Sequence, residues 1–151
     1  MEYTRTEAVG YAEAGRIEEW LHAFLQGPAD NAAFSEGLQQ KPRHWLGPVN
    51  VALDHIERCC GPEPHMEYVM PEESWQERTA LFRTWLAEAW DMPPLIGQLH
   101  EGRVSVRDGN HRMGALEQLG VADAWIIVWN DDGHEPLQRW LERVQGQTHE
   151  V

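Results

Sequence analysis

The sequence predicts a single α+β domain, in which a helical first third precedes a mixed set of strands and helices. Three segments repeat apolar residues at the three- and four-residue spacing of amphipathic helices: 11–26, 72–91 and 135–147. Three short apolar runs are instead typical of strands: 94–100, 103–108 and 122–131. Because a further helical segment at 110–120 separates the last two runs, the second half predicts a β-β-α-β order.

Length, charge and cysteine content limit the class of protein. A chain of 151 residues is most simply one domain, and no run approaches the roughly 18 apolar residues of a membrane span. The first residues have neither the basic start nor the apolar block of a secretory signal. The formal charge of −13 opposes stable binding to duplex nucleic acid, because such binding neutralises phosphates. Adjacent Cys59 and Cys60 are poorly placed for a disulfide, so we expect reduced thiols and a cytoplasmic protein.

The first half of the chain is expected to be helical and then irregular. Helix 11–26 places five apolar residues on one side: Ile17, Trp20, Leu21, Phe24 and Leu25. Gly27 and Pro28 end it. A short helix and loop follow, and apolar alternation over 49–56 predicts a short strand that leads into a turn or brief helix.

The segment 72–91 predicts the longest helix. Its apolar residues form one wide stripe: Trp75, Leu81, Phe82, Trp85, Leu86 and Trp90. The chain has 8 tryptophans, and because several recur at helical spacing we expect most of them to fill the core. Met92, Pro93 and Pro94 end the helix.

A polar turn interrupts the second half, where strand 103–108 meets helix 110–120. It reads Asp-Gly-Asn-His-Arg, residues 108–112. A helix beginning near Asn110 leaves backbone N–H groups and the positive end of its dipole free to bind an anion. Gly109 lets the backbone approach a ligand, and Arg112 and His111 add donors suited to phosphate. Asp108 fits this picture if it binds a divalent cation, accepts a proton or orients its neighbours.

The same five residues also fit an ordinary turn. Asp108 would then cap the N–H groups, Gly109 would turn the chain and Arg112 would lie in solvent. The pattern alone does not decide between an anion site and a turn. The scattered histidines have no zinc-site spacing.

The segment VRDGNHRMGALEQLGVADAWIIVW, residues 106–129, resembles the signature of the ParB/sulfiredoxin superfamily, which has a strand, a Gly-x-x-Arg-type turn, a helix and a strand. The preceding PPLIGQLHEGRVSVRDG is similar to the lead-in of that signature. The resemblance covers roughly residues 48–130. It implies a ParB/sulfiredoxin-like domain over 48–146, a helical extension over 1–47 and a loose tail over 147–151, packed as one unit.

The resemblance implies a nucleotide site for ATP or CTP with Mg²⁺. Gly109, Asn110, His111 and Arg112 would contact the phosphates, and Asp108 would be the metal ligand or, with His111, a catalytic group. Within the superfamily, partition proteins bind and hydrolyse CTP, sulfiredoxins use ATP to repair an oxidised cysteine, and a kinase branch phosphorylates free serine. Some members are classed as nucleases.

Departures from the family pattern reduce the number of activities that we expect of this chain. Asn110 stands where sulfiredoxins have their nucleophilic cysteine, and an amide cannot act as that nucleophile. The kinase branch needs a second carboxylate, for which Asp54 and Glu57 are candidates, although either could equally be a cap or a solvated charge. We therefore expect an NTP hydrolase or a kinase for a small hydroxyl compound. The alternative is a non-catalytic module that binds a nucleotide or a protein, and a nuclease ranks third.

Overall fold

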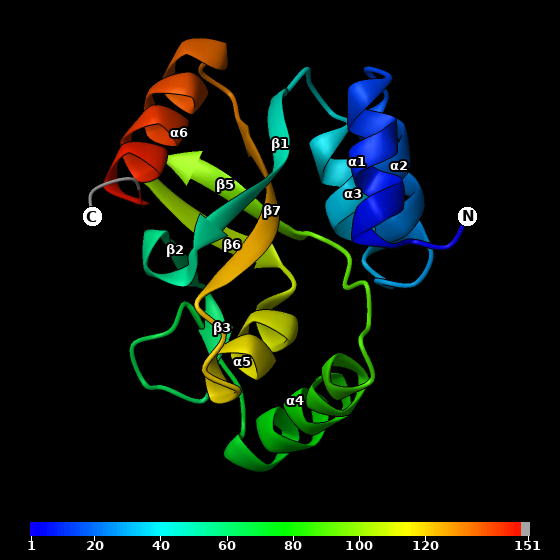
Figure 1. The fold of residues 1–151 in the computed structure, drawn as a ribbon, viewed down its shortest axis with the longest axis vertical. Helices are drawn as coiled ribbons and strands as arrows, with labels where there is room; N and C mark the ends of the chain where they lie inside the picture. The colour runs from blue at the N-terminus through cyan, green and yellow to red at the C-terminus, as the bar shows by residue number, and fades with distance from the viewer. Residues whose placement is uncertain (149–151) are drawn as a thin grey trace.

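A five-stranded mixed sheet organises the computed structural model, which describes residues 1–148 (Figure 1). Its strands are β1 (His44–Ala52), β2 (Ile56–Arg58), β5 (Leu95–His100), β6 (Arg103–Asp108) and β7 (Asp123–Asn130). Their order is β1-β7-β5-β6-β2. β5 pairs antiparallel with β6 and parallel with β7, so the β-β-α-β order is confirmed. A separate pair joins β3 (Cys60–Gly61) to β4 (Tyr68–Val69).

Six α-helices surround the sheet in the described part of the chain. They are α1 (Arg5–Glu13), α2 (Ile17–Gln26), α3 (Ala32–Leu38), α4 (Glu72–Ala87), α5 (Asn110–Gln118) and α6 (His134–Thr148). A brief 3₁₀ turn, η1 (Leu53–His55), follows β1 as the alternation over 49–56 predicted. The predicted α+β class is confirmed. No helix within residues 1–148 has the length and apolar character needed to cross a bilayer.

The two faces of the sheet have separate cores. Successive residues of a strand point to opposite faces, and β7 shows this clearly: Ile126 and Val128 lie in one cluster, Ile127 and Trp129 in the other. Helices α5 and α6 supply the first cluster through residues such as Met113 and Leu137. Helices α1, α2 and α3 cover the second face (Figure 1).

The amino-terminal region contains two helices where the sequence predicted one over 11–26. Gly15 has a φ of +72° and separates α1 from α2. The predicted apolar face is correct for α2, since Trp20, Leu21 and Leu25 are fully buried. The predicted boundary between residues 47 and 48 falls inside β1, at the irregularity between Leu46 and Val49 where the register of its pairing with β7 shifts. Helix α6 reaches Thr148, and the rest of the expected loose tail lies outside the described residues.

Helix α4 ends at Ala87, and only part of its wide apolar stripe is buried. Trp75 is buried, but Leu81 and Trp85 are 49% and 40% exposed. The helix lies at the edge of the molecule and packs against α5 (Figure 1). The rings of Phe82, Trp85 and Trp90 pack against one another, with centroids 5.1 to 5.7 Å apart. The apolar spacing at this end of the segment 72–91 therefore corresponds to a small aromatic cluster near the surface.

Candidate functional site

The turn between β6 and α5 leaves the amino end of the helix open. Gly109 adopts the left-handed conformation, with a φ of +101°, and a Cβ there would lie 2.8 Å from Leu95 Cδ2. Only glycine adopts this conformation without strain. No side chain within residues 1–148 caps α5, so Asp108 does not act as the cap that an ordinary turn would use. The first N–H groups of α5 remain available to an anion.

Asp108 bridges the turn to the amino-terminal region. Its Oδ1 accepts a hydrogen bond from Asn31 Nδ2 at 3.1 Å, and its Oδ2 accepts one from Arg112 Nη2 at 3.1 Å. The side chain is 12% exposed. Both carboxylate oxygens thus already have protein partners.

The Arg112 side chain points into the protein. It is 5% exposed and donates to the carbonyls of Pro93 and Pro94 as well as to Asp108. Burial lowers the pKa of Arg112 and the Asp108 charge opposes this effect. The guanidinium therefore anchors the segment before β5 to the turn, which leaves the backbone N–H of Arg112 as its contribution to an anion site.

Asn110 joins the turn to the two cysteines. Its side-chain oxygen accepts hydrogen bonds from the backbone N–H groups of Cys59 and Cys60, at 2.8 and 3.2 Å. Its amide donates to Val106 O at 3.0 Å. Asn110 therefore fixes β3 beside the amino end of α5.

His111 is half-buried and uncharged at neutral pH. Burial, and then the charge of Arg78, lower its pKa to about 4, although Asp108 acts in the opposite direction. Its ring lies 5.0 Å from that of Trp75, and its Nε2 lies 3.2 Å from Met70 Sδ. In the unliganded protein His111 therefore offers a neutral ring N–H as a donor.

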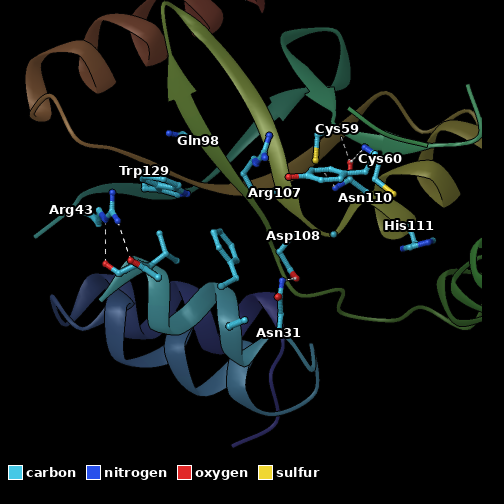
Figure 2. Close-up of a pocket in the computed structure, with 16 residues that line it drawn as sticks. Asn31, Arg43, Cys59, Cys60, Gln98, Arg107, Asp108, Asn110, His111 and Trp129 are labelled. Atoms are coloured by element: carbon cyan, nitrogen blue, oxygen red, sulfur yellow. Dashed lines mark hydrogen bonds between the residues drawn. The ribbon is translucent and has the colours of Figure 1, made fainter. Parts of the chain in front are cut away.

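A pocket of about 640 Å³ opens beside this turn, and we call it the Asp108 pocket (Figure 2). One wall is α3 with the preceding Asn31, and the other comes from the sheet. Sixteen residues line it: Asn31, Ala33, Phe34, Gly37, Leu38, Arg43, Cys59, Cys60, Tyr68, Gln98, Arg107, Asp108, Gly109, Asn110, His111 and Trp129. Four of the five predicted site residues are among them, and Arg112 is not. The amino-terminal region thus supplies six of the sixteen lining residues.

Sequence reasoning missed the other cations near the turn. Arg43 lies over the Trp129 ring and pairs with Asp131, while Arg107 pairs with Glu67. Arg78, on the exposed side of α4, lies close enough to influence the pKa of both His111 and Cys60, and it makes no ion pair within residues 1–148. These arginines come from separate elements, so no sequence motif connects them.

The structure places the candidate second carboxylates elsewhere. Asp54 and Glu57 line a different pocket, and Glu57 pairs with Arg103. Asp108 is the only carboxylate lining the Asp108 pocket among the described residues. Within residues 1–148, no group of three or more His, Cys, Asp or Glu side chains could hold a metal ion. A magnesium ion here would therefore depend on oxygen atoms of its ligand.

Comparisons with known proteins concern the fold. No protein-family model matches the chain, and no curated protein matches its sequence. Sulfiredoxin from Arabidopsis thaliana is similar in structure, with 18% identity and a TM-score of 0.38 over 62% of this chain and 94% of that chain. The ParB-N domain of a Pnob8-like protein is also similar in structure, with 15% identity and a TM-score of 0.43. The match covers 72% of this chain and 39% of that chain. The expected ParB/sulfiredoxin-like fold agrees with both, and the likeness is one of fold alone.

Proposed function

We propose that this protein binds a nucleoside triphosphate, ATP or CTP, in the Asp108 pocket, with the phosphates at the amino end of α5. The observation that carries the proposal is the uncapped helix end that lines a pocket beside a left-handed glycine. Free N–H groups at a helix amino end attract phosphate, and the helix dipole adds to the attraction. Gly109, Asn110, His111 and Arg112 contribute backbone N–H groups, and His111 adds a neutral ring donor.

Three arginines add cations in or beside the pocket, two of which are paired with the carboxylates Asp131 and Glu67. Arg43 and Arg107 line the pocket, and Arg78 stands near His111. Phe34 and Tyr68 also line the pocket, and their rings offer faces against which a base can stack. The buried Trp129 Nε1 has no hydrogen-bond partner within residues 1–148. A cytoplasmic setting fits the proposal, because both cysteines are free thiols.

Asp108 is the residue that would hold Mg²⁺, together with the phosphates. The ion would neutralise charge on the terminal phosphates. Asp108 would have to give up at least part of its hydrogen bonding to Asn31 or Arg112.

Between the two functional candidates, the geometry favours binding without turnover. A general base needs a free oxygen that faces the proton it removes, and both oxygens of Asp108 are engaged. Asp54 and Glu57 lie outside the pocket. A phosphotransferase or hydrolase, with Asp108 and His111 as the catalytic groups, is the second candidate. It requires a rearrangement that frees Asp108 when the hydroxyl substrate or partner binds.

A thermal-shift and calorimetry panel tests nucleotide binding. ATP and CTP, each with and without Mg²⁺, should raise the melting temperature of the whole chain, since a ligand at 100 times its Kd adds about 2.7 kcal/mol. Arg78→Gln should weaken triphosphate binding by roughly tenfold and leave the melting temperature of the free protein unchanged. Arg139→Gln, on exposed α6 away from the pocket, is the matched control. No stabilisation by either nucleotide would refute the proposal.

Phosphate release separates the two candidates. If the protein is a binding module, nucleotide should raise its melting temperature and no phosphate should be released over hours. Release that disappears in Asp108→Asn, while nucleotide affinity remains, would establish the enzyme instead.

A further inference from the structure

A sulfur and imidazole cluster lies in the wall of the Asp108 pocket, and we call it the Met70 cluster. Cys60 Sγ is 3.8 Å from Met70 Sδ, and His111 Nε2 is 3.2 Å from the same thioether sulfur. The three residues come from β3, from the segment before α4 and from α5. Cys60 and His111 lie on the same side of the pocket (Figure 2).

Hydrogen bonding alone does not explain why these three side chains lie together. A thioether is a poor acceptor, yet both the thiol and the imidazole approach the Met70 sulfur. Thiolate, thioether and neutral imidazole together are instead the ligands of a soft cation such as Cu(I). Thioethers do not select Mg²⁺ or Ca²⁺, which take oxygen ligands.

The two separations measured from the Met70 sulfur are close to those of a three-coordinate site. With metal–sulfur and metal–nitrogen bonds of about 2.3 and 2.0 Å, a trigonal centre separates two sulfurs by roughly 4.0 Å and sulfur from nitrogen by roughly 3.7 Å. The sulfur pair at 3.8 Å already fits. The sulfur–nitrogen pair at 3.2 Å must open by about half an ångström, which a small rotation of the half-buried imidazole allows.

We propose that Cys60, Met70 and His111 bind one soft monovalent cation, Cu(I). The Cys60 S–H bond breaks, its proton goes to solvent and the thiolate bonds to the metal. An imidazole proton on Nε2 moves through solvent to Nδ1, so that the Nε2 lone pair becomes a ligand. The thiolate and Cu(I) have opposite charges, so the occupied site gains no net charge beside Arg78. This proposal does not rest on nucleotide binding.

The neighbouring residues provide matched controls. Cys59 is buried, and its sulfur accepts the Asn110 amide at 3.4 Å, a role that serine can also fill. Met66 lies just before β4 and Met70 just after it, and Met66 lines the separate pocket that contains Asp54. Cys59→Ser and Met66→Leu therefore make the same chemical substitutions as the test variants, but at residues outside the Met70 cluster.

Competition with a chromophoric Cu(I) chelator, using the reduced full chain without oxygen, tests the proposal. The protein should remove one equivalent of Cu(I). Cys60→Ser, Met70→Leu and His111→Phe should each weaken binding at least tenfold, and the two controls should bind normally. Equal affinity in Met70→Leu and wild type, or a loss in Cys59→Ser equal to that in Cys60→Ser, would overturn the site in favour of adventitious thiol binding.

X-ray absorption of the Cu(I)-loaded wild-type chain gives an answer that does not depend on variants folding. Two sulfur ligands and one nitrogen ligand are expected. In parallel, Ag(I) should shift the NMR signals of the Met70 methyl group and the His111 ring together. A metal bound by sulfur alone, or an unshifted Met70 methyl group, contradicts the proposal.

Discussion

Arg112 shows how a residue type suited to phosphate can serve the fold. Its guanidinium is buried with Asp108 and two proline carbonyls. Removing one partner of a buried pair leaves the other charge uncompensated. The side chain therefore holds together the turn, the segment before β5 and, through Asp108, Asn31.

Replacing Arg112 by Met should lower the free energy of unfolding by about 3–5 kcal/mol, because Asp108 would remain buried without its cation. Urea denaturation at pH 7 measures the change. Arg139→Met is the control: it removes an exposed pair with Glu135 and should cost less than about 0.5 kcal/mol. A similarly small cost for Arg112→Met would mean that its guanidinium reaches solvent and remains available to a ligand.

His111 should make the stability depend on pH. Its pKa is about 4 in the folded protein against 6.5 as the ordinary value. The unfolded chain therefore binds a proton first as pH falls, so stability is complete above pH 6.5 and declines towards pH 4. Between pH 7 and 5, wild type should lose about 1–2 kcal/mol more than His111→Gln, allowing for solvent screening. Parallel losses in urea titrations of the two proteins would contradict this pKa.

At the scale of elements, the contact between α4 and α5 depends on a glycine. A Cβ on Gly114 would overlap the indole of Trp75 and lie 3.2 Å from Thr79 Cγ2. Trp75 and Thr79 form the buried face of α4. The two helices therefore approach each other closely at Gly114.

Gly114→Ala should lower the free energy of unfolding by about 1–3 kcal/mol, since α4 must move away from α5. Gly10→Ala is the matched control, because Gly10 is also within a helix but has nothing within 4 Å of its added Cβ. That change should raise stability by about 0.5–1 kcal/mol through helix propensity. Equal gains in both variants, measured by urea denaturation, would show that α4 can shift at no cost.

At the scale of the whole molecule, the sheet joins the two cores into one unit. Ile126 and Ile127 are both fully buried, but they belong to the clusters on opposite faces. Because the two residues are neighbours on β7, a substitution that destabilises one core should also destabilise the other.

Ile126→Ala and Ile127→Ala should each lower stability by about 2–5 kcal/mol and keep one cooperative transition. Far-ultraviolet circular dichroism and tryptophan fluorescence should give coincident melting curves for each variant. Two separate transitions in Ile127→Ala would instead show that residues 1–47 melt as an independent unit.

Much of the fold could be predicted because local patterns specify it. The β5–β6 hairpin needs positive φ at its turn, and Glu101 and Gly102 have φ of 51° and 78°. Gly120, the last residue of the predicted helical segment 110–120, has a φ of +72° and follows the end of α5. Local spacing could not reveal which part of the α4 stripe a neighbour covers. Leu81 and Trp85 on that stripe are exposed, and Trp85 is therefore an exception to the expectation that most tryptophans fill the core.

The sequence by itself determined the β-β-α-β segment, the turn at Asp108 and the helix end beside it, since these depend on neighbouring residues. Only the tertiary structure decided that Arg112 faces inward, that α3 closes one wall of the pocket, and that Cys60, Met70 and His111 meet. The physical reason is that burial and convergence depend on packing between distant segments. A periodic pattern shows that one side of a helix or strand is apolar or polar, but it does not show which other segment that side contacts.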